Sequence, residues 1–230
     1  MKYQSLHPWD VDYRTAVAIQ EELRGKLILE DRLPRDIRVV AGADISCTKG
    51  DDRVYAAVVL LDAGSLDVLE EATYCGRTPF PYIPGLLSFR EGPALLQAFE
   101  KLRGRPDVAL FDGQGIAHPR GFGLAAHLGL ILDVPAVGCA KTRLTGSFEE
   151  PGARRGQSSR LVHEGRVIGS VLRTKDRVKP VFVSPGHRVG HERAVDIVLR
   201  CSRRYRIPEP TRQAHILVNK IRRQAIRDRH

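Results

Sequence analysis

Apolar residues recur along the chain at two spacings, and each spacing is typical of one kind of secondary structure. Helical spacing predicts an amphipathic helix from about Val11 to Leu23, which Gly25 ends. Pro93 is expected in the first turn of the next helix, where its missing N–H costs nothing. The remaining expected helices are ALLQAFEKL (94–102), LAAHLGLIL (124–132), the segment 191–203 and a basic helix from Thr211 onward.

Short apolar runs bounded by turn residues predict strands. The first three, at 38–46, 54–61 and 66–74, are joined by the turn-rich linkers TKGDDR and DAGS, so antiparallel neighbours are expected. The order VALFD, glycine-rich loop, helix and AVGCA predicts a parallel strand pair with a right-handed crossover. An exposed loop at 145–159 then precedes the short strands LVHE, RVIGSVLRT and VFVS.

Three antiparallel strands, a helix and a parallel β-α-β unit predict an α/β fold with a mixed sheet flanked by helices on both faces. This is the ribonuclease-H-like order. The length of 230 residues and the absence of a visible linker predict one domain over residues 1–230. By analogy with that superfold, acidic residues of the first strand, first helix and fourth strand meet at a divalent metal. Here those places hold Asp44, Glu91 and Asp112.

Asp44 and Asp112 end apolar runs that otherwise indicate buried strands. A carboxylate in such a place is costly to desolvate and usually has a partner. Asp112 alone could cap a turn with Gly113, and Asp44 alone could pair with an arginine. The two together favour an oxygen-ligand site suited to Mg²⁺.

Three further residues are candidates for catalysis, each with a plainer alternative. Glu91 precedes Gly92-Pro93 at an expected helix start, where the helix dipole by itself favours negative charge. Lys141 follows a parallel strand, where ligands commonly bind, and could neutralise a phosphate; a simple exposed lysine is the alternative. His215, on the last helix, could orient or deprotonate water near neutral pH, or could be a structural histidine.

Two loops have compositions suited to nucleic-acid recognition. In RTPFPYIPG (77–85), prolines stiffen a loop that carries Phe80, Tyr82 and Ile83, so it could act as a wedge between stacked bases or as a buried plug. The glycines of DGQGIAHPRGFG (112–123) could let the backbone hold a planar base, although turns also explain them. His187 and His191 have helical spacing but lack the rest of a zinc motif.

The net charge of +10 indicates a polyanionic partner, with nucleic acid before acidic membrane because no amphipathic Trp/Phe face accompanies it. A merely soluble basic surface is the alternative. No apolar run reaches the length of a membrane span, and the N-terminus lacks a signal-peptide core, so a cytoplasmic location is expected. The scattered Cys47, Cys75, Cys139 and Cys201 form no CxxC and indicate no thiolate zinc site.

Several of these segments together resemble the endonuclease V family of deoxyinosine-directed repair nucleases. They are VAGADIS, PYIPGLLSFRE, FDGQGIAHPRGFGLAAHLG, CAKTRL and VSPGHRVG. The resemblance covers most of the chain, and PYIPG followed by FREGP and then DGQGIAHPR is highly specific in combination.

The resemblance implies that Asp44 and Asp112 hold Mg²⁺, with Mn²⁺ expected to substitute, and that Glu91 belongs to the same acidic centre. Lys141 and His215 match the family's active-site lysine and C-terminal histidine. The wedge residues would be Pro81, Tyr82, Ile83 and Pro84, and the lesion-base pocket would be formed by Gly85, Leu87, Gly113, Gly123 and Leu124.

The activity implied is DNA repair: a monomeric enzyme flips out a deaminated nucleotide and nicks the second phosphodiester on its 3′ side, leaving 3′-hydroxyl and 5′-phosphate ends. An inosine-specific ribonuclease is one rival, because 2′-hydroxyl contacts are invisible in sequence. The nuclease domain of an excision-repair protein is another, and it would be expected to have further domains. A non-catalytic damage-binding module is the third, and it would be expected to lack an acidic ligand.

Overall fold

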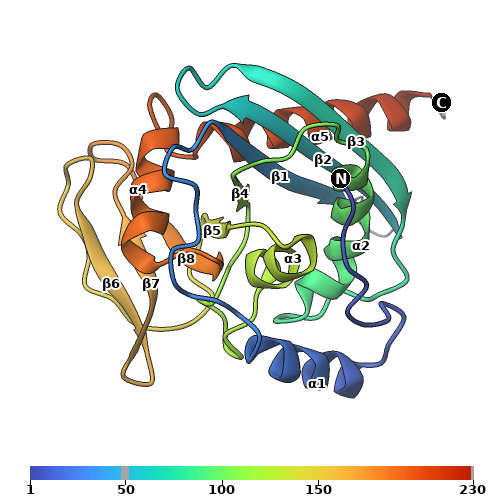
Figure 1. Cartoon of the computed structure of the whole chain (residues 1–230), viewed down its shortest axis with the longest axis horizontal. Helices are drawn as coiled ribbons and strands as arrows, with labels where there is room; N and C mark the ends of the chain where they lie inside the picture. Colours follow the sequence, from blue (N-terminus) through green and yellow to red (C-terminus); the bar gives the residue numbers. More distant parts are fainter. Residues whose placement is uncertain (48–51, 229–230) are drawn as a thin grey trace.

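One mixed sheet of eight strands runs through the computed structural model, which describes residues 1–47 and 52–228 (Figure 1). The strand order across the sheet is β3-β2-β1-β4-β5-β8-β7-β6. The strands are β1 (Val39–Cys47), β2 (Arg53–Asp62), β3 (Val68–Arg77), β4 (Val108–Phe111), β5 (Ala136–Ala140), β6 (Ser158–His163), β7 (Arg166–Leu172) and β8 (Val181–His187). The helices are α1 (Tyr13–Arg24), α2 (Leu87–Glu100), α3 (Leu124–Leu132), α4 (His191–Cys201) and α5 (Glu209–Arg227).

The pairing of the strands confirms the fold class predicted from the sequence. Strands β1, β2 and β3 form an antiparallel meander, and β4 and β5 run parallel to β1 with α3 as the crossover. Strands β8, β7 and β6 then extend the sheet in antiparallel fashion. The turn expected between the first two strands falls largely on residues 48–51, outside the described residues.

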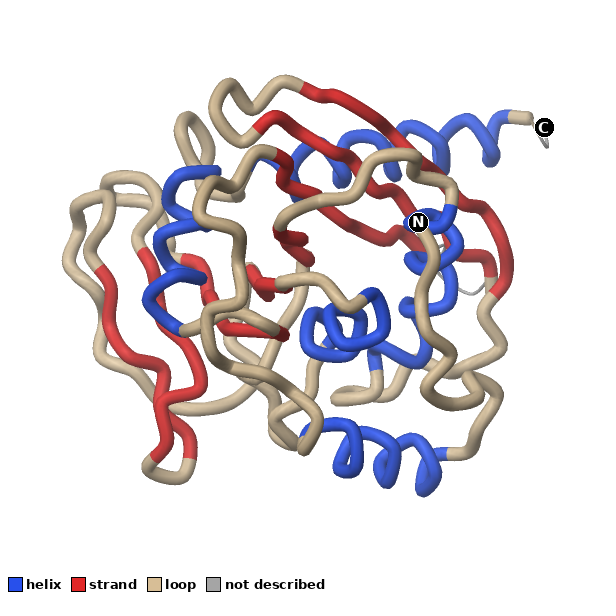
Figure 2. The backbone as a smooth tube through the Cα atoms, in the orientation of Figure 1, coloured by secondary structure: helices blue, strands red, loops and turns tan. Residues whose placement is uncertain are grey.

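Helices cover both faces of the sheet, as Figure 2 shows. Alternate residues of β1 point to opposite faces, as a strand requires. Ala41 packs with the buried side chains of α2 and α3, whereas its neighbour Val40 packs with those of α4. Helix α5 covers the outer part of the second face, where Val218 contacts Tyr55 of β2.

Helix α5 begins unusually close to β1. A Cβ atom on Gly42 would lie 2.0 Å from the backbone carbon and oxygen of Pro210, so only glycine permits this approach. Gly42 stands two residues before Asp44 on the same face of the strand. The absence of a side chain at position 42 therefore sets how near α5 comes to the predicted site.

The start of α2 differs from the sequence prediction. The helix begins at Leu87, so Pro93 lies inside it rather than in its first turn. Burial of Phe89 and Leu95 on either side of Pro93 stabilises the helix, although the proline removes one backbone donor. Glu91 consequently lies beyond the first turn, and the dipole of a helix start does not explain its presence.

Other boundaries shift for identifiable reasons. The third strand starts at Val68, since Leu66 adopts φ 66° in the preceding turn. Strand β8 runs on to His187 through Pro185, whose carbonyl accepts a hydrogen bond from Ile116 N–H at 2.8 Å. Strand β6 begins at Ser158, so the last two residues of the loop expected at 145–159 belong to the strand.

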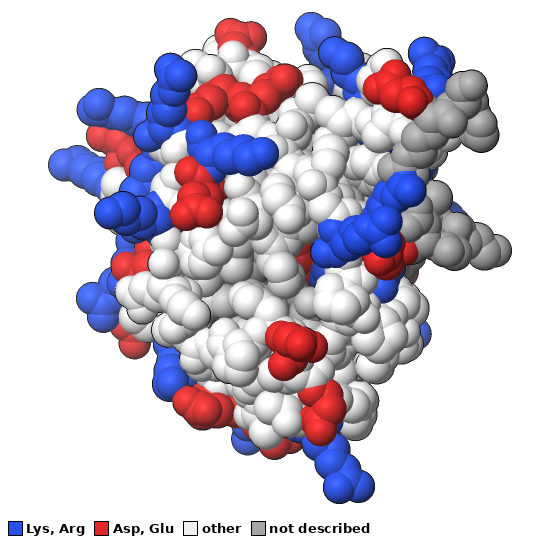
Figure 3. Space-filling model, turned by 90° about the vertical axis from the view of Figure 1, so that its right-hand side faces the viewer, with Lys and Arg blue, Asp and Glu red and all other residues white. Residues whose placement is uncertain are grey.

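The charged residues are unevenly distributed. On the face shown in Figure 3, a broad uncharged area occupies the middle, and basic and acidic side chains stand around its margin. Helix α5 is the most basic of the described helices by its sequence, with Arg212, Lys220, Arg222, Arg223 and Arg227. No helix in the described part of the chain is both long and apolar enough to cross a bilayer.

Candidate active site

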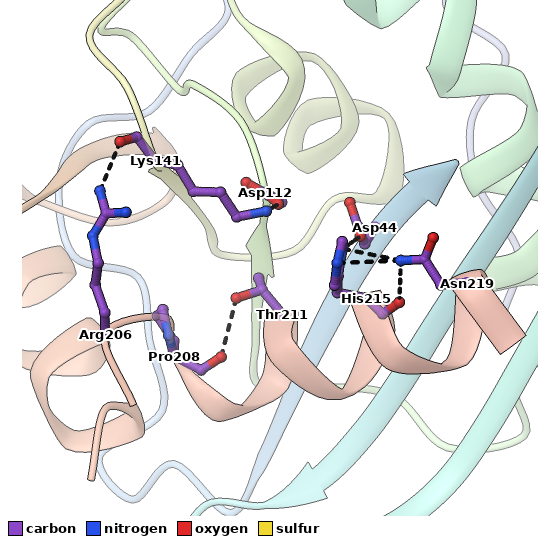
Figure 4. A network of polar contacts seen from close by, with 8 residues as sticks. All are labelled: Asp44, Asp112, Lys141, Arg206, Pro208, Thr211, His215 and Asn219. Atoms are coloured by element: carbon purple, nitrogen blue, oxygen red, sulfur yellow. Dashed lines mark hydrogen bonds and ion pairs between the residues drawn. The ribbon is translucent and has the colours of Figure 1, made fainter. Parts of the chain in front are cut away.

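The parallel pairing of β1 and β4 brings two aspartates side by side. The register pairs Ala43 with Phe111, so the residues that follow, Asp44 and Asp112, stand level at the same edge of the sheet. Helix α5 adds His215 from the adjacent face (Figure 4). One ligand atom from each of Asp44, Asp112 and His215 lies within 4.8 Å of the other two.

Asp44 and His215 form a hydrogen-bonded pair across 171 residues of sequence. The Nδ1 atom of His215 lies 2.7 Å from Oδ2 of Asp44, whose side chain is buried, whereas the imidazole is about half exposed. Asn219, one helical turn further on, donates from Nδ2 to the His215 carbonyl at 2.8 Å and lies 3.2 Å from Nε2. When Nδ1–H donates to the carboxylate, Nε2 is the acceptor of the ring and lies within reach of the Asn219 amide.

Lys141 pairs with the second aspartate. It follows β5, and its Nζ donates to Oδ2 of Asp112 (Figure 4). The lysine side chain is 40 % exposed, so its ammonium is accessible to a ligand as well as to Asp112. Lys141 thus lies directly after a strand of the parallel pair, where the sequence analysis expects it.

Glu91 reaches the same acidic centre from α2. Burial and then the charges of Asp44 and Asp112 raise the pKa of Glu91 to about 8. Burial, followed by the charge of Asp112, also raises the pKa of Asp44, against the opposing hydrogen bond from His215. The charge of Asp112 thus disfavours the ionised forms of both Asp44 and Glu91.

This crowding fits a divalent cation, which would remove the repulsion between the carboxylates. One ligand atom from each of Asp44, Asp112 and His215 lies within 4.8 Å of the other two, near enough for one ion to be bound by all three. Carboxylate oxygens suit both Mg²⁺ and Mn²⁺. Asp44 and Asp112 are the residues that would hold the ion.

The raised pKa of Glu91 leads to a test on metal-free protein. Between pH 4.5 and 8 the folded state holds a proton on Glu91 that the unfolded state releases, so stability falls as pH rises through this window. We expect Glu91→Gln to equal the wild type near pH 4 and to exceed it near pH 9 by on the order of 2 kcal/mol, after allowance for partial solvent screening. Denaturant unfolding in EDTA measures the difference.

Glu70→Gln is the matched control for this test. Backbone N–H groups of Arg103 and Gly104 lower the pKa of Glu70, so its contribution has the opposite sign and is lost as pH falls. A difference between Glu91→Gln and the wild type that does not change with pH would contradict the assignment of Glu91 to the crowded centre.

The proline-rich loop is anchored at its base and exposed at its tip. Phe80 is buried and stacks on Phe89 of α2 with ring centres 5.6 Å apart, while Arg90 donates to the Phe80 carbonyl at 2.7 Å. Tyr82, in contrast, is 72 % exposed. The buried-plug alternative thus describes Phe80, and the tip that includes Tyr82 is available to a partner.

The other end of this loop is fixed at Gly85, which has φ 81°. Its carbonyl oxygen accepts hydrogen bonds from Gln20 Nε2 at 3.0 Å, Arg120 Nη2 at 2.7 Å and His118 Nε2 at 3.0 Å. Arg120 Nε also donates to Gln20 Oε1 at 2.6 Å. Three side chains from two distant segments therefore set the direction in which the loop enters α2.

The protonation state of His118 follows from these contacts. Burial and the charge of Arg120 lower the pKa of His118 to about 4, so the ring is neutral near pH 7. Its Nδ1 accepts from the Arg120 backbone N–H at 3.1 Å, which leaves the proton on Nε2 for Gly85. His118 acts here as an uncharged donor.

A cavity of about 110 Å³ lies between the proline-rich loop and the loop after β4. Its walls include four of the five predicted pocket residues, Gly85, Leu87, Gly123 and Leu124, and three of the predicted wedge residues, Tyr82, Ile83 and Pro84. Its lining does not include Gly113, which lies against Leu124 instead. The remaining walls are Gln20, Ser88, Gln114, His118 and Leu144.

Some residues of this region were absent from the sequence prediction. Gln20 is a polar residue on the buried face of α1 with Ala16 and Leu23, and that position on an apolar stripe was the available signal. Asn219 follows His215 by four residues, which places the two on one helix face. Ser88 carries no signal of its own in the sequence.

Comparison with known proteins identifies the family of this chain. The sequence model of the Endonuclease V family matches residues 21–216. The chain belongs to the Endonuclease V family. An Endonuclease V of Methanothrix thermoacetophila is 52% identical over 217 residues, which cover 94% of this chain and 95% of that protein.

Solved Endonuclease V structures share the fold. The enzyme of Streptomyces avermitilis is 45% identical and superposes with a TM-score of 0.90, covering 95% of this chain and 96% of its own. Endonuclease V of Ciona intestinalis, solved with a 24mer DNA that contains an inosine followed by a ribo-adenosine, is 27% identical with a TM-score of 0.81 and covers 90% of this chain and 96% of its own. Family membership makes this protein a nuclease.

Proposed function

We propose that this Endonuclease V recognises deaminated bases in DNA, deoxyinosine above all, and nicks the strand at the second phosphodiester bond on the 3′ side by Mg²⁺-dependent hydrolysis. The products would carry 3′-hydroxyl and 5′-phosphate ends. The observation that carries the proposal is the position of the acidic centre beside a cavity. The exposed Tyr82 of the proline-rich loop forms part of the wall of this cavity.

The acidic centre has the donors for hydrolysis of a phosphodiester. Asp44 and Asp112 would hold the ion from rigid strand ends, and Glu91 would complete the negative charge around it. Mg²⁺ bound there would lower the pKa of a water and neutralise charge on the phosphate. Mn²⁺ would be expected to replace it.

The flanking residues supply proton transfer and charge. With Nδ1–H held by Asp44, the Nε2 atom of His215 can accept a proton from water, as in other carboxylate-oriented histidines. The partly exposed ammonium of Lys141 can neutralise the negative charge that develops on the phosphate oxygens.

The cavity and the acidic centre share two structural elements. Helix α2 contributes Leu87 and Ser88 to the cavity and Glu91 to the acidic centre, and one helical turn is about 5.4 Å. The segment after β4 contributes Asp112 to the centre and Gln114 to the cavity. A base held in the cavity would place a neighbouring phosphodiester, rather than its own, at the carboxylates.

Selection of the lesion would begin before the cavity is reached. Flipping a base out of the helix costs a few kcal/mol and least for a mispaired base, so inosine is favoured. Tyr82, with Pro81, Ile83 and Pro84, would fill the vacated space in the duplex. The relative from Ciona intestinalis, bound to inosine-containing DNA, supports this choice of substrate.

The direct test is cleavage of an end-labelled duplex that contains one deoxyinosine, with Mg²⁺ and with EDTA. With Mg²⁺ we expect one nick at the second bond on the 3′ side, which DNA ligase can reseal directly because its ends are 3′-hydroxyl and 5′-phosphate. With EDTA we expect no nick. Matched duplexes with adenine at the same place, and inosine-containing RNA, are the controls. Faster cleavage of the RNA would favour the ribonuclease alternative, and binding without cleavage would favour a damage-binding module.

A monomeric state and a cytoplasmic location remain predictions from the sequence. Size-exclusion chromatography with light scattering checks the first, and fractionation of cells that express the protein checks the second.

A further inference from the structure

Arg206 makes an unusual contact near Lys141 (Figure 4). It lies between α4 and α5, and its Nη2 donates to the backbone carbonyl of Lys141 at 2.7 Å and to that of Pro180 at 2.8 Å. Both acceptors belong to backbone that leads into or out of the sheet. The guanidinium therefore joins two chain segments that are distant in the sequence.

The two carbonyls lie where a strand pair ends. Strands β5 and β8 are antiparallel, and their pairing reaches Ala140 opposite Phe182. Lys141 follows the first strand and Pro180 precedes the second, so a proline stands where the pairing would need a backbone donor. Arg206 supplies a side-chain donor at that end of the ladder.

Arg206 is itself held in place on the side of α5. Thr174 Oγ1 donates to the Arg206 carbonyl at 2.6 Å. Two residues later, the Pro208 carbonyl accepts from Arg212 N–H at 2.9 Å and from Thr211 Oγ1 at 3.1 Å in the first turn of α5. The segment that carries Arg206 is thus continuous with the fixed start of the helix that presents His215.

The Lys141 backbone needs such support because its side chain is flexible. The lysine ammonium is a point charge on a stem with four rotatable bonds, and its aim depends on where the stem begins. Gln114 Nε2 donates to the next carbonyl, that of Thr142, at 3.0 Å from the side of the cavity. Arg206 and Gln114 therefore hold consecutive peptide groups.

Electrostatics places the arginine in the same neighbourhood. Burial and the charge of Asp112 raise the pKa of the Cys139 thiol, and the charges of Arg206 and Lys141 oppose that rise. The charges of Asp112, Lys141 and Arg206 thus all affect the pKa of one buried thiol.

We infer that Arg206 is a positioning residue for strand cleavage, which holds the Lys141 backbone so that its ammonium reaches the Asp112 side of the active site. This inference rests on the proposed function. It assigns Arg206 no contact with DNA and no contact with a metal.

The test compares Arg206→Gln with Arg155→Gln. Arg155 is a matched control, since its Nη2 also joins two backbone carbonyls, those of Leu199 at 2.8 Å and Ser202 at 3.2 Å, away from the acidic centre. We expect Arg206→Gln to lower the single-turnover rate of inosine-duplex cleavage by about ten- to a hundredfold, as for a misplaced catalytic group. Arg155→Gln should keep the wild-type rate.

Two readouts separate positioning from general damage. The Kd for the inosine duplex, measured in EDTA, should change by less than about threefold in Arg206→Gln, because the lost contact acts on cleavage rather than on binding. In a Lys141→Met background, Arg206→Gln should lower the rate by no more than about twofold further, because both changes remove the same function.

Several results would overturn the inference. They are a full additional loss in the Lys141→Met background, a loss of binding that matches the loss of rate, or an equal loss in Arg155→Gln. If Arg206→Gln does not fold, Arg206→Lys retains the charge without the planar fork and is expected to lower the rate with Kd unchanged; wild-type behaviour of that variant would also overturn it. Failure of the wild type to nick inosine DNA would instead count against the proposed function.

Discussion

Asp44→Asn is expected to reduce Mg²⁺-supported nicking of a deoxyinosine duplex by about a thousandfold or more, while the variant still binds the duplex. Removing one charged ligand of the ion sacrifices several kcal/mol of transition-state stabilisation, and each 1.36 kcal/mol is tenfold in rate. The asparagine keeps the size of the side chain and an oxygen that can accept from His215 Nδ1. Single-turnover cleavage and binding in EDTA measure the two effects.

The fold of this variant should survive the change. Burial and the charge of Asp112 raise the pKa of Asp44, so a neutral residue at this position relieves repulsion in the metal-free protein. Asp62→Asn is the matched control, since Asp62 also ends a strand but accepts from the N–H groups of Gly64 and Ser65 at 2.9 and 2.7 Å. Nicking by Asp44→Asn at the rate of the control would end the assignment of Asp44 as a metal-binding residue.

Tyr82→Ala is expected to weaken binding to inosine within a duplex by about tenfold or more, and to affect a single-stranded inosine substrate much less. Stacking of an aromatic side chain on a base contributes about 1–3 kcal/mol, and only the duplex has a vacated space to fill. The loop is anchored through Phe80 and Gly85, so removal of the exposed ring should leave its base in place. Titration with both substrates in EDTA gives the comparison.

Tyr13→Ala provides the control for this prediction. Tyr13 is 54 % exposed at the start of α1 and does not line the cavity. Its removal should leave both affinities unchanged. A loss in Tyr82→Ala that is equal for duplex and single strand would show that Tyr82 contacts the nucleotide without acting as a wedge.

The sheet and the two aspartates were predictable for a simple physical reason. A strand such as β2 is buried along almost its whole length, and its continuous apolar run shows this in the sequence. Asp44 and Asp112 interrupt such runs, and the carboxyl ends of adjacent parallel strands lie at one edge of a sheet. Their proximity therefore followed from the order of the elements once β1 and β4 were recognised as neighbours.

Other parts of the site depend on packing that local sequence does not encode. The contact between His215 and Asp44 requires α5 to lie directly on Gly42, a relation set by tertiary structure alone. Pro93 locally predicts a first turn, but α2 begins at Leu87 because burial of the preceding turn overrides that preference. The hydrogen bond from Gln20 to the Gly85 carbonyl joins residues 65 apart, and neither residue type predicts it.

The joint use of α2 by the cavity and the acidic centre has a consequence for the damaged strand. Because the span between the two is built into a rigid helix, the incision of the proposed function would have its offset set by the protein rather than by the flanking nucleotides. A lesion would then be cut at the same distance whatever bases surround it.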